Sequence, residues 1–169
     1  MRTAGLLTKS LGLGSAVLAF AALTSPAAEL IPLNGDSYAR MLRSQRGKVV
    51  LVDFWATWCE PCREELPKLV ALSRKVDSRK FQLITVSADE PELESAVVKA
   101  LDREGVRGPR YIKRVDDDQA FIDSIDKKWS GALPALFLYD ASGHRVAGFI
   151  GESDAAEVEA AVRKAIQRH

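Results

Sequence analysis

The sequence has very few of the residues that build covalent or metal-linked frameworks. Only two cysteines, Cys59 and Cys62, and two histidines, His144 and His169, occur among its 169 residues. A framework of structural disulfides is therefore excluded, and a zinc site, which needs four ligands, would have only these two histidines to add to the two sulfurs. The two cysteines must react with each other, react with a partner, or stay idle.

The chain also lacks an excess of charge of either sign. Its formal net charge is +1, and without Arg2 and Lys9 the 24 basic residues become 22 against 23 acidic ones, a net charge of −1. Positive residues gather in one stretch, but three aspartates follow at once, so we interpret the stretch as a solvated face. We therefore expect no nucleic-acid partner. The stretch contains Arg103, Arg107, Arg110, Lys113 and Arg114.

Charge is missing altogether from residues 10–28, at the start of the chain. Arg2 and Lys9 precede an apolar run there, and small residues follow it, which is the layout of a secretory signal peptide. The alternative is an uncleaved anchor, because a membrane-spanning helix needs roughly 20 apolar residues. Glycines and polar residues within the run favour cleavage, with Ala27 as the preferred position.

This layout predicts two parts of the chain. Residues 1–28 are a signal peptide or an uncleaved N-terminal anchor, and residues 29–169 are one domain. We expect the domain to be exported to the periplasm, with membrane contact only if the N-terminal segment stays uncleaved. In an oxidising compartment a CxxC pair is more often redox-active or bonded than bound to zinc.

Hydrophobic periodicity in residues 29–169 indicates an α/β fold. Residues 48–56 form a continuous β-branched and aromatic run, as in a strand buried on both faces of a sheet. A helix over 60–76 and a strand over 81–87 complete a β-α-β unit. Two later strands, at 133–140 and 144–150, are close enough for an antiparallel hairpin. Further helices are expected at 36–42, at 92–104, from Asp118 to about 129, and from 153 or 154 to about 167, while 105–117 is irregular or holds one short strand at 111–115.

The two cysteines stand where the buried strand ends and a helix begins. The first N–H groups of a helix are unpaired and its dipole is positive there, so a thiolate at Cys59 is stabilised relative to the thiol. A lowered pKa makes Cys59 reactive. Cys62, one turn into the helix, reaches back to Cys59 and is less exposed. We therefore predict that Cys59 attacks and Cys62 resolves, the alternatives being a zinc half-site or an inert pair.

The segment VLVDFWATWCEPCREELP, residues 50–67, resembles the active-site segment of the thioredoxin superfamily. In particular it resembles the TlpA and ResA type of exported bacterial thiol-disulfide reductases, and the resemblance extends over most of residues 48–151. It implies an α/β thioredoxin fold with a central mixed β-sheet flanked by helices on both faces. Residues 89–117 resemble an enlarged connection between the βαβ and ββα halves.

The resemblance also implies roles for residues around the cysteines. Pro134 would be a cis-proline beside the disulfide, and Leu133 would offer backbone hydrogen bonds to an extended substrate. The alternative for Pro134 is an ordinary trans proline at the start of a strand. Trp58 would shield the sulfurs, and Glu60 and Pro61 would be among the substrate-binding residues.

Two carboxylates are candidates for the base that takes the proton of Cys62 when a mixed disulfide is released. Asp53 lies on the buried strand where thioredoxins keep a buried aspartate, and Glu65 matches a glutamate of the ResA type. Many relatives of that type have a neutral residue at the position of Asp53, so the division of labour stays open. The alternative for Glu65 is a solvated charge like Glu64.

These observations predict an exported thiol:disulfide oxidoreductase that reduces protein disulfides. Glu60 places a negative charge near the nucleophile and disfavours its thiolate, which favours a reductant. The expected partners are a disulfide-bearing protein substrate and a membrane thiol donor, and cytochrome c maturation or a related thiol pathway is compatible. No cofactor or metal is expected, because the cysteines carry the electrons.

The residues disfavour two other functions of the same fold. A thiol peroxidase needs a threonine and proline pocket before its cysteine, and TWCEPC has none. A copper-binding chaperone could use both sulfurs and His144, but that group normally spaces its cysteines more widely.

Overall fold

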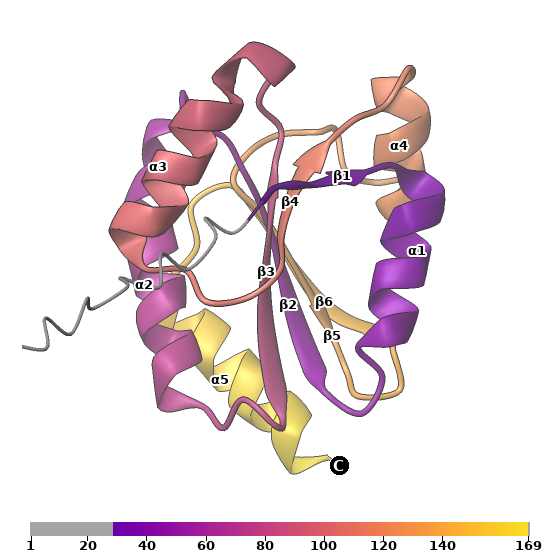
Figure 1. The fold of residues 1–169 in the computed structure, drawn as a ribbon. Helices are drawn as coiled ribbons and strands as arrows, with labels where there is room; N and C mark the ends of the chain where they lie inside the picture. Colours follow the sequence, from indigo (N-terminus) through magenta and orange to yellow (C-terminus); the bar gives the residue numbers. More distant parts are fainter. Residues whose placement is uncertain (1–28, 169) are drawn as a thin grey trace, which may run out of the picture.

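The computed structural model describes residues 29–168, which form a six-stranded sheet with helices on both faces (Figure 1). The strand order is β1-β4-β3-β2-β5-β6. The first four are parallel to one another, whereas β5 is antiparallel to β2 and β6 is antiparallel to β5. This mixed sheet confirms the predicted fold class. The strands are β1 (Ile31–Leu33), β2 (Val49–Trp55), β3 (Phe81–Ser87), β4 (Arg110–Lys113), β5 (Ala135–Tyr139) and β6 (Arg145–Ile150).

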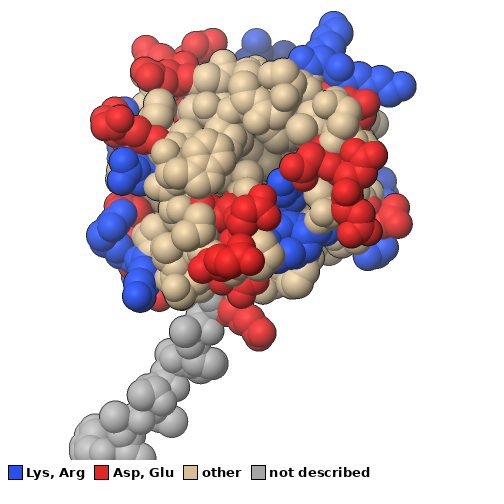
Figure 2. All heavy atoms as spheres, turned by 90° about the horizontal axis from the view of Figure 1, so that it is seen from above, with Lys and Arg blue, Asp and Glu red and all other residues tan. Residues whose placement is uncertain are grey.

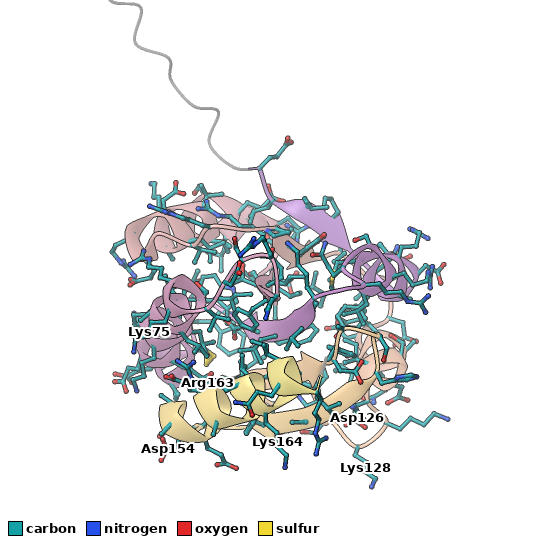
Figure 3. All side chains as sticks on the ribbon, turned by 90° about the horizontal axis from the view of Figure 1, so that it is seen from below. Lys75, Asp126, Lys128, Asp154, Arg163 and Lys164 are labelled. Carbon is teal, nitrogen blue, oxygen red and sulfur yellow. A yellow bond between two sulfur atoms is a disulfide. The ribbon has the colours of Figure 1, made fainter. Side chains whose placement is uncertain are left out.

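The helices divide between the two faces of the sheet. Helices α2, α3 and α5 cover one face, and α1 and α4 cover the other (Figure 1). Seen from below, Asp154 marks the start of α5, which runs beside α2 (Figure 3). The helices are α1 (Gly35–Ser44), α2 (Glu60–Lys75), the 3-10 turn η1 (Pro91–Leu93), α3 (Glu94–Glu104), α4 (Asp118–Ile125) and α5 (Ala155–Gln167).

Strand β2 is buried along its whole length. It pairs with β3 from Val49 to Trp55 and with β5 on its other side. Because side chains alternate across a strand, Val49 and Leu51 join the core under α2, α3 and α5, while Val50 and Val52 join the core under α1 and α4. The C-terminal end of β2 therefore lies in the middle of the sheet edge.

One predicted helix ends earlier than its sequence pattern suggested. Helix α4 is capped by Asp117, not Asp118, and ends at Ile125 instead of continuing to about residue 129. Asp126 Oδ1 accepts a hydrogen bond from the backbone N–H of Lys128 at 3.0 Å, which closes a turn. Trp129, just after this turn, is part of the core, because its ring packs on Phe54 with the centroids 4.9 Å apart.

Two features of the structure were not predicted. Strand β1 pairs in parallel with β4, but it has three residues, too few to show a period, and one of them is Pro32. The positive stretch is also not a free solvated face. Arg110 is buried and its Nη2 donates to the carbonyl of Val106 at 2.8 Å. Four of the five positive residues form ion pairs, namely Arg103–Glu104, Arg110–Asp102, Lys113–Asp118 and Arg114–Glu94.

The predicted signal peptide or anchor, residues 1–28, lies outside the described residues. Within residues 29–168, none of the helices has the length and apolar character needed to cross a membrane.

Candidate active site

The two cysteines lie at the start of α2, four residues after the end of β2. Cys59 is the N-cap residue of the helix, and its Sγ accepts a hydrogen bond from the backbone N–H of Cys62 at 3.3 Å. Pro61, in the first turn, has no N–H to leave unpaired, so it suits this position. The sequence therefore begins a helix at the point where the central strand delivers the first cysteine.

Cys59 and Cys62 form a disulfide, with their Cα atoms 5.3 Å apart. Cys59 is 7% exposed and Cys62 is 2% exposed. A partner thus reaches Cys59 more readily, as the helical spacing predicts. When the bond is reduced, the unpaired N–H groups and the dipole of α2 stabilise a thiolate at Cys59. This arrangement is suited to exchange between a disulfide and a pair of thiols.

A carboxylate that the sequence analysis missed anchors the loop before Cys59. Asp89, just after β3, is completely buried. Thr57 donates to it from its backbone N–H at 2.9 Å and from its hydroxyl at 2.6 Å, and the Ser87 hydroxyl donates at 2.7 Å. These contacts tie the active-site loop to the end of β3, and charge-assisted hydrogen bonds of this kind are strong. The available signal was a Ser-Ala-Asp sequence at the end of a buried strand.

The Leu133–Pro134 peptide bond is cis, as the resemblance implied. Pro134 is buried, and its carbonyl accepts a hydrogen bond from the N–H of Gly151 at 2.8 Å. Leu133 packs against the core cluster that contains both cysteines. The structure therefore brings the start of β5 to the same end of the sheet as the disulfide.

The other predicted substrate-binding residues lie on the surface of this end. Trp58 is 65% exposed, so the indole that was expected to shield the sulfurs stands largely in solvent. Glu60 is exposed and Pro61 is half-buried. Figure 2 shows this end from above, with a broad uncharged area and charged side chains along its border. Such an area is suited to contact with another polypeptide.

Both candidate bases are buried, Asp53 on β2 at 2% exposure and Glu65 on α2 at 8%. Within residues 29–168, Asp53 Oδ2 and both carboxylate oxygens of Glu65 have no hydrogen-bond partner. Burial raises the pKa of Asp53 well above its usual value, and the negative charge of Glu65 raises it further. Burial also raises the pKa of Glu65. Ser153 and the positive charge of Lys68 lower this pKa, but by less than burial raises it. Glu65 is thus not a solvated charge like Glu64.

Further polar atoms without partners face the same side of the sheet. Thr85 is the register partner of Asp53 on the neighbouring strand β3, and its hydroxyl has no hydrogen-bond partner within the described residues. The same holds for Nε1 of Trp55, two residues after Asp53. Alternation along β2 places Asp53 and Trp55 on the face that α2 covers. The two carboxyls therefore lie in a polar part of an otherwise apolar layer.

His144 lies apart from this site. It is exposed in the β5–β6 hairpin, where its Nδ1 is 2.8 Å from the hydroxyl of Ser142. No group of three or more His, Cys, Asp or Glu side chains within residues 29–168 is arranged so that it could hold a metal ion.

Solved structures with a similar fold indicate the class of this protein. A crystal structure of a thiol:disulfide interchange protein of the thioredoxin family from Chlorobium tepidum TLS matches with a TM-score of 0.61 and 26% identity, over 73% of this chain and 83% of that one. The thioredoxin domain of a thiol-disulfide oxidoreductase from Bacteroides vulgatus matches with a TM-score of 0.57 and 28% identity, over 72% and 84%. The class is the thioredoxin-fold thiol:disulfide oxidoreductases.

Residues 19–164 match the Redoxin family model, and the chain belongs to this family. It is 32% identical over 123 residues to the thiol-disulfide oxidoreductase ResA of Bacillus thuringiensis (strain Al Hakam), covering 73% of this chain and 66% of that protein. For ResA of Geobacillus kaustophilus (strain HTA426) the identity is 32% over 120 residues, covering 71% and 63%. The chain thus spans just under two thirds of the length of these relatives. The resemblance to the ResA type is confirmed.

Asp53→Asn tests the environment of the buried carboxyl. A carboxyl whose pKa is raised by folding contributes stability that is complete below its unfolded pKa of about 3.9 and is lost as pH rises through the folded pKa. Asn carries no titratable proton, so we expect Asp53→Asn to abolish this loss of stability with pH. Its free energy of unfolding at pH 7 and above should exceed that of the parent protein by about 1–3 kcal/mol. Urea unfolding followed by circular dichroism between pH 4 and 9 measures the free energy of unfolding of both proteins.

The matched control for this substitution is Asp116→Asn, at an exposed aspartate. It should leave the pH dependence of unfolding as in the parent protein. A lower stability of Asp53→Asn at every pH would show that the carboxyl is satisfied in the fold.

Proposed function

We propose that this chain is an exported enzyme that reduces disulfide bonds of other proteins by dithiol-disulfide exchange at its Cys-Glu-Pro-Cys motif. The observation that carries the proposal is the position of Cys59, which caps α2 and is the more exposed of two bonded cysteines. The ResA relatives are called thiol-disulfide oxidoreductases, which supports the same chemistry.

The reaction takes two exchange steps. The Cys59 thiolate attacks one sulfur of the substrate disulfide, forms a mixed disulfide and displaces the other substrate sulfur as a thiolate. The Cys62 thiolate then attacks Cys59, re-forms the internal disulfide and releases the second substrate sulfur. Two electrons pass to the substrate, and a dithiol donor must then reduce the internal bond while becoming a disulfide itself.

The second step requires Cys62 to lose its proton inside the protein. Cys62 is 2% exposed, so water has little access to it. Asp53 and Glu65 are both buried carboxyls with unpaired oxygens, and a pKa raised toward neutrality suits a general base. One of these two carboxyls takes the proton.

The negative charge at the motif favours electron flow from this protein to its substrate. Glu60 is exposed between the two cysteines, where a negative charge disfavours the Cys59 thiolate and makes the couple more reducing. The signal-like segment at residues 1–28 supports export, and a membrane thiol donor would supply the electrons. The chemistry is compatible with a substrate in cytochrome c maturation or another thiol pathway.

Replacing each cysteine separately distinguishes attack from resolution. Cys62→Ser should form a stable mixed disulfide with a peptide disulfide and release one equivalent of substrate thiol without turnover. Cys59→Ser should form no adduct, because the remaining sulfur is buried. Intact-mass spectrometry after mixing measures both outcomes. Turnover by Cys59→Ser would overturn the proposal.

The reduction potential of the cysteine pair tests the direction. We expect a value near that of thioredoxin, roughly −270 mV, whereas a value near roughly −120 mV would identify an oxidant. Glu60→Gln should make the potential less reducing, since it removes the charge beside the nucleophile. Glu64→Gln, at an exposed position further along α2, is the matched control and should leave the potential unchanged. Equilibration with defined thiol-disulfide buffers gives these values.

Single-turnover kinetics identify the base. Removal of a general base typically slows proton transfer by about 10²–10⁴-fold, so either Asp53→Asn or Glu65→Gln should slow the release of the mixed disulfide by this order. Release in that variant should then rise with pH through about 8.5, the pKa of an ordinary thiol. Glu64→Gln should behave as the parent protein. Normal release in both variants and in the double variant would exclude both carboxyls.

A further inference from the structure

The end of the molecule opposite the disulfide is strongly basic. It consists of the ends of α1, α2 and α5, the loops that lead into β2 and β3, and the β5–β6 hairpin (Figure 1). These segments carry nine positively charged residues against two negatively charged ones, Asp77 and Asp140, an excess of seven positive charges. The nine residues, called the basic face below, are Arg43, Arg46, Lys48, Arg74, Lys75, Arg79, Lys80, Lys164 and Arg168.

Contacts between the segments place them on one surface. The carbonyl of Lys80 accepts a hydrogen bond from the N–H of Val49 at 2.9 Å, and the N–H of Gly47 donates to the carbonyl of Ala141 at 2.8 Å. A cavity of about 190 Å³ is lined by these four residues and by Ile166 of α5. Figure 3 shows this end from below, where α5 runs beside α2. The nine charges therefore belong to one face of the molecule.

The charges of the basic face are hardly neutralised by the protein itself. Within residues 29–168, only Arg79 of the nine forms an ion pair, with Asp77 at 2.7 Å. Arg74 donates to the carbonyls of Glu104 and Gly105, which are uncharged partners. All nine residues are exposed except Lys48, which is half-buried. The face thus presents its positive charge to the solvent.

Helix ends alone do not explain the face. Positive residues at the C-terminal end of a helix interact favourably with its dipole, which accounts for those in the last turns of α1, α2 and α5. Arg46, Lys48 and Lys80 lie outside the helices and have no such role. Like charges gathered on one face repel one another and destabilise the fold. An anionic partner would remove this repulsion.

The active-site end has the opposite charge. The first turns of α2, α3 and α5 each contain an acidic residue, and Glu90, Glu92 and Glu152 lie in the adjoining segments. Lys113 and Arg114 at this end are paired with acidic residues. The net charge of the chain is therefore near zero although its two ends differ. A molecule with this separation of charge is oriented by a charged surface.

The make-up of the basic face indicates which anionic partner fits it. Large exposed apolar side chains occur in residues 29–168 at Ile31, Trp58, Leu93, Val146 and Ile150, and none of them belongs to this face. Binding would thus be electrostatic, without insertion of apolar side chains. An exported protein that takes electrons from a membrane donor works beside phospholipid headgroups and not beside nucleic acid.

We propose that the basic face docks on an anionic phospholipid surface and holds the disulfide on the side away from the membrane. The proposal rests on the proposed function in one respect, since export and a membrane thiol donor select lipid as the partner. It adds a reversible association with the membrane that does not depend on residues 1–28.

Vesicle binding tests the proposal. The experiment uses residues 29–169, which contain every strand and helix of the fold, so that the apolar run at the start of the chain does not itself bind lipid. Co-sedimentation should show binding about tenfold tighter or more to vesicles with about one third phosphatidylglycerol than to pure phosphatidylcholine, because each Lys or Arg near the surface contributes roughly fivefold. Raising the salt from about 0.05 M to about 0.5 M should abolish the difference.

A charge-removal variant tests the assignment to this face. The triple variant Lys75→Gln, Lys80→Gln and Lys164→Gln should bind the anionic vesicles about tenfold more weakly or less. All three lysines are exposed and distant from the disulfide, so its rate of disulfide reduction without vesicles should equal that of the parent protein.

The matched control removes the same charge elsewhere. Arg63→Gln, Lys68→Gln and Lys99→Gln change three exposed positive residues outside the basic face and should keep the binding of the parent protein within about twofold. An equal loss in both triple variants would show that net charge alone governs binding and would overturn the assignment.

Tryptophan fluorescence reports the orientation. Among the described tryptophans only Trp58 is exposed, and it lies at the active-site end. Vesicles with brominated acyl chains should therefore leave its emission unquenched when the protein is bound. Strong quenching would overturn the orientation.

The outcomes separate this proposal from the proposed function. If the parent protein binds both kinds of vesicle equally, the docking face is wrong, while reduction of peptide disulfides in solution is unaffected. If it reduces no peptide disulfide but binds anionic vesicles through the basic face, the proposed function fails and the docking face stands.

Discussion

The complete burial of β2 is the constraint on which the rest of the structure depends. A strand without a solvent-facing side needs cover on both faces, and α2, α3 and α5 on one side and α1 and α4 on the other supply it. Because β2 pairs with β3 and β5, its end opens in the middle of the sheet edge. Cys59, four residues further on, therefore meets the positive end of α2, the loop after β3 and the start of β5 at one place.

Around the disulfide, the side chains proposed to serve the reaction also destabilise the fold. The layer between β2 and α2 is apolar except for a few groups, and two of these are carboxyls whose pKa values burial raises. Unpaired buried polar groups destabilise a fold. In the proposed mechanism one of them takes the proton of Cys62, which is 2% exposed and therefore has little access to bulk water. Asp89 is the contrasting case, since its bonds to Thr57 and Ser87 make it a structural anchor.

Most of the architecture followed from periodicity. The buried strand at 48–56, the helix after it and the hairpin near the end of the chain were predicted within a few residues, because each has a strong local pattern. The misses have physical reasons as well. β1 is three residues long and is held by β4, and α4 ends early because a turn closed by Asp126 competes with further helix. Arg110, taken as a surface charge, is buried beside Asp102.

The sequence by itself determined the kind of chemistry, because two cysteines three residues apart, after a continuous apolar run and before a helical pattern, already predict a reactive sulfur and its resolving partner. Only the tertiary structure decided what surrounds them. The contact of Asp89 with Thr57 spans 32 residues, and the start of β5, with its cis-proline, lies at the same end of the sheet as the disulfide. Local patterns carry helix and strand preferences, whereas pairing of distant side chains depends on how the strands are ordered in the sheet.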